Sequence, residues 1–433
     1  MLEAGGRKEI IKSEQLSLFL SQFLRAPKLL QNTSHNILIV TYWAFDDALV
    51  QTYTIPYLRI IKKILPANSI IYLVTQEPNL EKLDQLNTHS DPDFQLLPMV
   101  YTPFGGRAIL KLKKMVSFLT KFIDQNNIKT IHAWCTPAGA IAYLLHKKTK
   151  VRLVIDSFEP HAESMVENGT WESNSMAFKI LWKLEKKQAR SASHLIGLTN
   201  GMRQYCLEKY GVTPRQFHVK PACVDSLLYG KSVHQDIRQS LGINKEDTVC
   251  VYAGKIGGIY YEDEVFLFWK ACIQVIPNFK VLFLTNFTPE ETELMCAKHG
   301  LDPKIIIQKF VPHNEIPELL AQADFALNPV KPVPSKKYCT SIKDGEYWSS
   351  GLPVVITPNI SEDSDIIEQN KIGVILKSTE YEDLLNSAKE IKSLLLKPEL
   401  SDKIKEMANH YRSFEIANKV YAKIYSNPEK VPC

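Results

Sequence analysis

Residues 341–355 read SIKDGEYWSSGLPVV and decide how the chain is built. The polar and aromatic residues at the start predict a helix over residues 343–350, and Gly351 is the residue type that commonly follows the last turn of a helix. The apolar run at 353–357 then predicts a buried strand. The stretch therefore indicates one helix-to-strand unit of an α/β domain.

The same alternation extends along the chain in both directions. Apolar runs that predict strands are separated by stretches with helical periodicity, and residues 381–425 are helical only. This alternation predicts an α/β fold with parallel sheets and right-handed crossovers. The expected strands lie at 35–43, 69–76, 94–101, 129–134, 151–160 with its polar loop, 194–199, 248–254, 280–286, 305–311, 325–330, 353–357 and 373–376.

The length of 433 residues is too large for one ordinary hydrophobic core. A polar, irregular segment interrupts the alternation and predicts a linker between two doubly wound, Rossmann-like domains. The predicted divisions are an N-terminal extension (1–35), a first domain (36–225), the linker (226–247), a second domain (248–405) and a C-terminal helical segment that packs back on the first domain (406–433).

Composition excludes several classes of protein. Hydrophobic residues make up 45% and charged residues 23% of the chain, as in ordinary globular proteins. No apolar run approaches the roughly 18 to 20 residues of a membrane-spanning helix, and no secretory signal stands out, so we expect a cytoplasmic protein. The eight cysteines form no C-x-x-C pair or Cys/His ligand spacing, which predicts neither a zinc site nor a disulfide framework.

Positive charge gathers in the first half of the chain. Residues 1–225 carry 28 Lys and Arg against 19 Asp and Glu, whereas the remainder carries 24 against 28. Lysine clusters at 111–114, 147–150 and 183–187 fall on helical stretches. They are either solvated helix faces or contacts with an anionic membrane surface or acceptor. Nucleic acid is disfavoured as a partner because no stacking aromatics are interleaved with these charges.

In open parallel sheets, ligands bind at the carboxyl ends of the strands. Gly254, Lys255 and Gly257 follow such a strand end directly, within the run GKIGG. Glycines there permit close backbone approach, and the lysine beside them can contact a phosphate. A tight strand-to-helix turn without a ligand is the alternative.

The helix that begins near Ser341 is a second candidate site. Its first turn presents free N–H groups and the positive end of the helix dipole, and Lys343 adds a charge. Glu346 lies three residues later on the same face, within reach of a sugar hydroxyl if a diphosphate binds at Lys343. A surface ion pair between the two side chains is the alternative.

The loop at 156–161 offers two carboxylates and an imidazole, from Asp156, Glu159 and His161. These side chains are candidates for a ligand site, and loop stabilisation is the alternative. His132 lies inside the strand at 129–134, where a core histidine and a site residue are both consistent with the pattern.

Taken in order, these segments resemble the retaining GT-B glycosyltransferases of family four. The resemblance rests on HNILIVTYW, TIHAW, VIDSFEPHAESMVENGTW, the helix with Glu185, LIGLTNGM and VKPACVD in the first domain. In the second domain it rests on VYAGKIGG, FVPHNEIPELLAQADFALNPV, SIKDGEYWSSGLPVV and DIIEQNKIGVIL. It covers about residues 36–425.

The resemblance implies transfer of a sugar from a nucleotide diphosphate sugar with retention at the anomeric carbon. It implies no bound metal and no cofactor, since the nucleotide sugar is a substrate. Lys255 and Lys343 would hold the diphosphate, Glu346 the ribose, and His161 with Glu159 the sugar and acceptor side. The donor-binding residues that it implies are Gly254, Gly257, Pro312, Ile316, Ser341, Ile342, Lys343 and Glu346, with Pro312 and Ile316 bordering the nucleobase.

One position departs from the family pattern. Many members carry a second glutamate eight residues before the one at Glu346, where this chain has Tyr338. The pattern of Lys343, Glu346 and Tyr347 is similar to branches that act in cell-surface polysaccharide assembly. We therefore expect a membrane-peripheral glycosyltransferase with a lipid-linked or growing glycan as acceptor. The alternatives are a nucleotide-sugar epimerase or glycan phosphorylase of the same architecture, and a degenerate domain that binds nucleotide sugar without catalysis.

Overall fold

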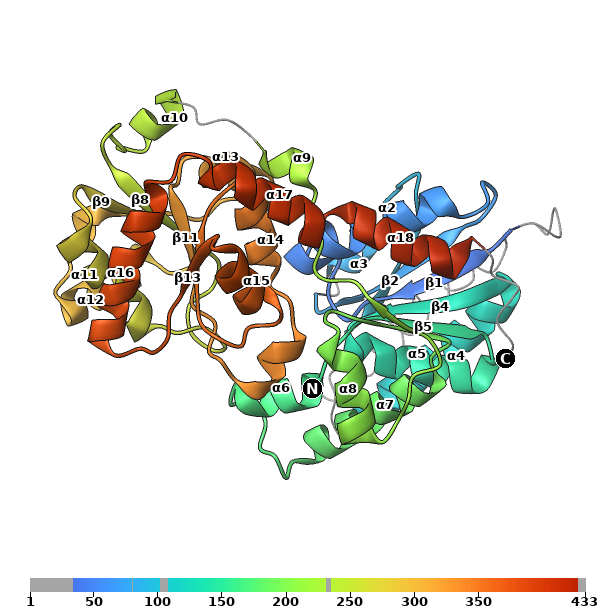
Figure 1. Ribbon diagram of the computed structural model, residues 1–433. Helices are drawn as coiled ribbons and strands as arrows, with labels where there is room; N and C mark the ends of the chain where they lie inside the picture. Colours follow the sequence, from blue (N-terminus) through green and yellow to red (C-terminus); the bar gives the residue numbers. More distant parts are fainter. Residues whose placement is uncertain (1–33, 80, 102–107, 231–234, 427–433) are drawn as a thin grey trace, which may run out of the picture.

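Two parallel sheets, each flanked by helices, lie side by side in the molecule (Figure 1). The computed structural model describes residues 34–79, 81–101, 108–230 and 235–426. All but the last two residues of the predicted N-terminal extension lie outside these ranges. The predicted fold class, two doubly wound parallel-sheet domains with C-terminal helices, is confirmed.

The first sheet has seven parallel strands in the order β3-β2-β1-β4-β5-β6-β7. On β1, Ile37 and Ile39 face one core cluster, and Leu38 and Val40 face another, as the two-residue period of a strand requires. Both faces are thus buried, which explains the continuous apolar runs in the sequence. The strands are β1 (Asn36–Val40), β2 (Ile71–Glu77), β3 (Gln95–Val100), β4 (Ile128–Trp134), β5 (Arg152–Phe158), β6 (His194–Gly197) and β7 (Phe217–Val219).

Helices cover both faces of this sheet. One core cluster joins it to α4, α5, α7 and α8, and another joins it to α2 and α18. The helices are α2 (Ile55–Ile64), α3 (Glu81–Leu86), α4 (Ala108–Gln125), α5 (Thr136–Thr149), α6 (His161–Glu167), α7 (Met176–Ser191) and α8 (Gly201–Tyr210). Helix α2 is preceded by a π-helical turn, η2 (Val50–Thr54), and Pro56 in the first turn of α2 has no N–H to donate to a regular ladder.

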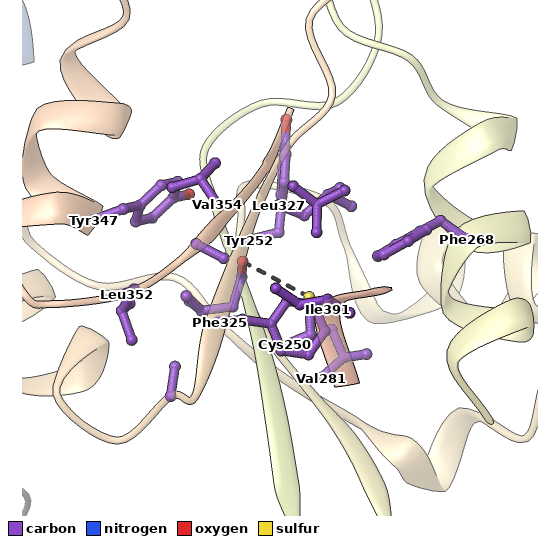
Figure 2. Packing of buried hydrophobic residues seen from close by; sticks show 14 of the residues in the cluster. Cys250, Tyr252, Phe268, Val281, Phe325, Leu327, Tyr347, Leu352, Val354 and Ile391 are labelled. Carbon is purple, nitrogen blue, oxygen red and sulfur yellow. Dashed lines mark hydrogen bonds between the residues drawn. The ribbon is translucent and has the colours of Figure 1, made fainter. Parts of the chain in front are cut away.

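The second sheet has six parallel strands in the order β10-β9-β8-β11-β12-β13. Figure 2 shows its core, where Tyr252 of β8, Val281 of β9 and Leu327 of β11 lie among side chains from the flanking helices. The strands are β8 (Thr248–Ala253), β9 (Phe279–Leu284), β10 (Ile306–Lys309), β11 (Phe325–Asn328), β12 (Val354–Ile356) and β13 (Gly373–Ile375).

The helices of this domain include the unit predicted from residues 341–355. Helix α14 spans Ile342–Ser349, and Gly351 follows it with φ +77°, its N–H donating to the Trp348 carbonyl over 2.9 Å. Gly351 thus ends the helix as predicted. The other elements are α11 (Asp263–Val275), α12 (Pro289–His299), η3 (Pro303–Ile305), η4 (His313–Glu315), α13 (Ile316–Leu320), η5 (Pro334–Tyr338), α15 (Asp363–Asn370) and α16 (Tyr381–Leu395).

The chain passes twice between the domains. It first leaves through the linker that holds α9 (Ser226–Tyr229) and α10 (Gln235–Ser240), and it returns between α17 (Leu400–Arg412) and α18 (Phe414–Tyr425). The two passages touch, since Val224 donates to the Arg412 carbonyl over 2.7 Å. As Figure 1 shows, α17 lies on the second domain and α18 on the first, against α2.

Candidate functional site

The ammonium group of Lys343 lies at the start of α14, above the end of β8. Its Nζ atom is 3.9 Å from the ring centroid of Tyr260 and 4.8 Å from that of Tyr252. This Nζ is buried and has no hydrogen-bond partner among the described residues. Burial acts to lower the pKa of Lys343, but Tyr260 and Tyr252 outweigh it and the pKa lies above its ordinary value. The site therefore holds a desolvated positive charge.

Gly254 makes room for this lysine. It has φ +134°, and a Cβ atom placed on it would lie 2.6 Å from the Lys343 Nζ. The Tyr347 hydroxyl accepts a hydrogen bond from the Ala253 N–H over 3.0 Å and so fixes α14 against the end of β8. The structure brings Gly254 and Lys343, two of the predicted site residues, into direct contact.

The glycine run continues as a turn at the end of the strand. Gly257 has φ +81° and Gly258 +62°, a backbone conformation that favours glycine. The Lys255 side chain is exposed, and its carbonyl accepts a hydrogen bond from the Tyr252 hydroxyl. The turn thus exists as a structural element, with Lys255 on its outer side.

The start of α14 is fixed by polar contacts beneath it. Ser341 caps the helix by accepting from the Asp344 N–H, and Asn328 at the end of β11 donates to Ser341 Oγ over 3.1 Å and to Asp344 Oδ1 over 2.7 Å. Burial raises the pKa of Asp344 to about 6, although Arg412 acts against it. Ile342, the first residue of the helix, is half-buried.

Glu346 lies one turn along α14 and is buried. Its Oε1 accepts from the Tyr229 hydroxyl over 2.8 Å and lies 3.6 Å from His313 Nε2. Burial raises the pKa of Glu346, against the opposing effects of His313, Tyr229 and Lys343. His313 lies between Pro312, which is exposed, and Ile316, which is half-buried at the start of α13.

Neither His313 nor Tyr229 is singled out by the sequence. Both are distant from Glu346 along the chain, and Tyr229 belongs to the linker, so only the folded arrangement brings them together. The motif FVPHNEIPELL contained one usable signal, a histidine beside the proline predicted to border the nucleobase.

From the first domain, Glu159 and His161 form a pair at the end of β5. Glu159 Oε1 lies 3.0 Å from His161 Nδ1, and Glu159 Oε2 accepts from the Cys339 thiol of the second domain over 3.0 Å. Burial acts to raise the pKa of Glu159, but His161 and Lys336 outweigh it and lower the pKa to about 2. Glu159 is thus an ionised carboxylate that joins the two domains.

The segment that contains Tyr338 makes further contacts with the first domain. The Ser335 N–H donates to Glu167, and the Lys336 Nζ donates to Ser164 Oγ over 3.3 Å. Tyr338 itself packs edge-on against Tyr205 of α8, with ring centroids 4.9 Å apart. The side chain at the position of the missing family glutamate is therefore turned toward α8.

Asp156 and His132 lie in a different cluster, which is fully buried. Asp156 pairs with Lys220 over 3.3 Å and accepts from the Tyr421 hydroxyl over 2.7 Å. His132 Nε2 lies 3.4 Å from Asp156, and its Nδ1 lies 2.6 Å from the Tyr425 hydroxyl. Because these contacts tie α18 to β4 and β5, the structure favours a core role for both residues.

Within the described ranges, no group of three or more His, Cys, Asp and Glu side chains is arranged to hold a metal ion. The cationic groups at the site are side chains, above all Lys343. A search of the same residues finds no helix long and apolar enough to cross a membrane.

Comparison with known proteins places the chain among glycosyltransferases. A family profile described as "Glycosyltransferase Family 4" matches residues 71–226, and one described as "Glycosyl transferases group 1" matches residues 233–411. Together they cover most of both domains. No curated protein sequence matches the chain significantly.

Solved structures share the fold at low sequence identity. Sucrose-phosphate synthase from Thermosynechococcus elongatus has a TM-score of 0.70 at 13% identity, covering 91% of this chain and 99% of that chain. HepE from Anabaena, in complex with UDP-glucose, has a TM-score of 0.66 at 15% identity, covering 90% and 98%. WaaG, a glycosyltransferase involved in lipopolysaccharide biosynthesis, has a TM-score of 0.64 at 15% identity, covering 90% and 99%.

The two sheets, the site at their carboxyl ends and the two family matches define the class of protein: the chain belongs to the glycosyltransferases of the GT-B fold. It is therefore an enzyme of the transferase class. The predicted GT-B glycosyltransferase family and fold are confirmed, and the retaining mechanism stays a prediction.

Proposed function

We propose that the protein transfers a sugar from a nucleotide diphosphate sugar, with retention at the anomeric carbon, to a lipid-linked or polysaccharide acceptor. The observation that carries the proposal is the Lys343 ammonium, which is buried, has no hydrogen-bond partner among the described residues and lies at the N-terminus of α14. Two tyrosine side chains stabilise this ammonium, but no carboxylate of the described chain neutralises it, so an anionic ligand is the simplest reason to retain it.

The chemistry follows from where charge develops. When the bond between the sugar and the diphosphate breaks, negative charge grows on the leaving diphosphate, and a cation fixed in a dry site stabilises it most. Lys343 and the α14 N-terminus would supply that stabilisation, with Lys255 at the outer side of the glycine turn. We propose that the reaction needs neither a bound metal nor a cofactor.

Glu346 would hold the ribose of the donor. Its carboxylate is one helical turn beyond Lys343, so a nucleotide whose diphosphate lies at Lys343 can place ribose hydroxyls at Glu346. Tyr229 and His313 both contact Oε1 and orient the carboxylate. Pro312 and Ile316 flank His313 and would border the nucleobase.

Uridine nucleotides are the first donors to test. The HepE structures hold UDP or UDP-glucose, and a trehalose-6-phosphate protein from E. coli holds UDP-2-fluoro glucose. Glu159 and His161 would contact the sugar and the acceptor from the first domain. Their link to Cys339 means that this pair and the donor domain meet directly.

The test is release of nucleotide diphosphate from purified protein supplied with a panel of nucleotide sugars, with and without EDTA. Activity that survives EDTA and yields a product of unchanged anomeric configuration by NMR supports the proposal. A nucleotide sugar interconverted without transfer would instead identify an epimerase. Tight nucleotide binding with no turnover of any donor would identify the degenerate binding protein.

We also propose that the enzyme works at the cytoplasmic face of an anionic membrane. Helices α4 and α7 pack on the same side of the first sheet, and each exposes both apolar and basic side chains. Leu110 and Met176 are each 69% exposed, and Ile180 is 44% exposed. Apolar side chains that insert among lipids beside lysines that attract headgroups are typical of interfacial helices. The exposed lysines are Lys111, Lys113, Lys114, Lys179 and Lys183.

Co-sedimentation with neutral and anionic vesicles tests this surface. We expect binding to anionic vesicles that weakens with salt and is lost in the Lys179→Glu, Lys183→Glu double variant. The matched control is Lys389→Glu, Lys397→Glu, which alters two exposed lysines of the second domain. Equal binding by both double variants would refute the surface, and no binding at low salt would refute membrane contact.

A further inference from the structure

Glu185 carries a fully buried carboxyl group that has no part in the chemistry proposed above. It lies on α7, where its Oε1 accepts from the Ala162 N–H over 2.8 Å and its Oε2 accepts from the Tyr210 hydroxyl over 2.8 Å. No lysine, arginine or histidine of the described chain forms an ion pair with it. A lone buried acid is costly to retain, so its location needs a reason.

The reason lies at the start of α6. This helix begins at His161, and its N-cap residue, Pro160, has no side chain that can accept from the first turn. The free N–H groups of a helix start need partners, and here Glu185 reaches across from α7 to supply one. The hydrogen bond falls on Ala162, the residue next to His161. It therefore fixes the backbone from which the His161 ring projects toward Glu159.

The same carboxyl ties a third element to the site. Tyr210 ends α8 and is itself buried, so α6, α7 and α8 meet at Glu185. The ionisable groups that surround it are Glu159, Glu163, Tyr205, Cys206 and Tyr210. Burial raises the pKa of Glu185 to about 8, and Glu159 and Glu163 add to the increase against the hydrogen bonds from Ala162 and Tyr210. Near neutral pH the group is mostly protonated, and glutamine is its closest mimic.

We propose that Glu185 is a positioning residue for His161, because it caps α6 from α7 and sets the place of the imidazole at the sugar side of the site. The inference rests on the proposed function only for the role of His161 in transfer. The positioning itself is a property of the fold and can be measured without substrate.

Three variants separate positioning from general stability. Glu185→Gln keeps an oxygen for the Ala162 N–H, Glu185→Leu removes it, and Tyr210→Phe removes only the second contact. We expect Glu185→Leu to lower kcat by about 10²-fold, as for a catalytic group displaced by about 1 Å, with the donor KM almost unchanged. Glu185→Gln and Tyr210→Phe should stay within a few-fold of the wild type. Glu208→Leu, an exposed change on α8, is the matched control.

The second readout is the His161 imidazole signal in protein labelled with ¹³C-histidine, assigned through His161→Asn. We expect this signal to move in Glu185→Leu and to stay in place in Glu185→Gln and in the control. If the His161 signal is displaced in Glu185→Leu but the wild-type protein transfers no sugar, the positioning is supported and the proposed function is refuted. If the wild type transfers sugar, and Glu185→Leu leaves both the His161 signal and kcat unchanged, the inference is overturned.

Glu185→Gln also covers the case in which the leucine variant does not fold. As pH rises through about 8, the wild-type carboxyl ionises beside Glu159 and Glu163, and the His161 signal and kcat should change. Glutamine cannot ionise, so the variant should lack this step. Identical pH profiles for the two proteins between pH 7 and 9 would overturn the proposal.

Discussion

Lys220 of the first domain and Lys343 of the second each hold an ammonium group that is shielded from solvent, and the two differ in what lies beside that group. Lys220 is 3.3 Å from Asp156 and 3.8 Å from the ring centroid of Tyr57. Lys343 has a similar tyrosine neighbour, 3.9 Å from its Nζ, but no hydrogen-bond partner among the described residues. Both charges are desolvated, and only one is neutralised by the protein itself.

The neighbours of each ammonium group distinguish the structural role of Lys220 from the ligand-binding role proposed for Lys343. Lys220 and Asp156 satisfy each other, and they lie under α18 where a ligand has no access. Lys343 is flanked by two tyrosine rings and by Gly254, and no carboxylate forms an ion pair with it in the described chain, which is why we propose that its charge serves a phosphate. Removing Lys220 should damage the fold, whereas removing Lys343 should damage the reaction.

The largest effect is expected for Lys220→Met. The substitution leaves the Asp156 carboxylate buried without its cation, which should lower the free energy of unfolding by about 3–5 kcal/mol. Urea denaturation measures the loss. Lys419→Met, which breaks the exposed pair with Glu415 on α18, should cost at most about 1 kcal/mol. Equal losses in the two variants would contradict the structural role given to Lys220.

Lys343→Met should reverse this pattern. Turnover should fall by about 10²- to 10³-fold, the usual result of deleting a group that stabilises charge in a transition state. The free energy of unfolding should fall by much less than in Lys220→Met, because Lys343 has tyrosine neighbours but no ion-pair partner in the described protein. Steady-state kinetics and urea denaturation of the same preparation test both parts. Lys337→Met, an exposed change in η5, is the control.

Gly254→Ala should disturb Lys343 without removing it. A Cβ atom at this position would lie 2.6 Å from the lysine Nζ, and φ +134° is strained for alanine. We expect turnover to fall by about 10-fold or more, since small displacements of positioned groups are costly. Gly169→Ala shares a positive φ but has open space around it, so it should leave turnover unchanged. Wild-type turnover in Gly254→Ala would place Lys343 outside the reaction.

Acid should weaken the ion pair between Asp156 and Lys220. Burial acts to raise the pKa of Asp156, but Lys220 and His132 outweigh it and lower the pKa to about 2 from the ordinary value near 3.8. A carboxyl with a lowered pKa stabilises the fold above its unfolded-state value and loses that contribution as pH falls from about 4 to about 2. The stability difference between wild type and Asp156→Asn should therefore shrink across that interval. A difference that is constant from pH 6 to pH 2 would contradict the lowered pKa.

The strand pattern and the meeting of Gly254 with Lys343 could both be predicted from the sequence. Buried parallel strands are continuous apolar runs, and the carboxyl ends of β8 and β11 converge at one edge of the sheet. The same reasoning could not place His132 and Asp156, because their burial depends on α18 returning from the second domain.

Two contacts between distant parts of the sequence were equally hidden. The Cys339 thiol meets Glu159 across 180 positions of sequence, and Tyr229 meets Glu346 across 117. Neither contact leaves a periodic or motif signal, since the first depends on how the two domains meet and the second on how the linker helix α9 packs on the second domain. The contact of Glu159 with Cys339 and the orientation of Tyr338 are therefore findings of the structure alone.

The smallest effect is expected for Glu346→Gln, which tests the proposed ribose contact one helical turn beyond Lys343. The neutral amide weakens the hydrogen bonds that a carboxylate accepts from ribose hydroxyls, so the donor KM should rise by about 10-fold, or about 1.4 kcal/mol, with a smaller change in kcat. A nucleotide diphosphate that lacks the ribose hydroxyls completes a double-mutant cycle by calorimetry. Wild type should bind it more weakly than the normal nucleotide, and Glu346→Gln should discriminate less, while Glu318→Gln, an exposed change on α13, should behave as wild type. If Glu346→Gln discriminated between the two nucleotides as strongly as the wild type, Glu346 would not bind the ribose. Only the proposed role of Lys343 in the donor site would then remain supported.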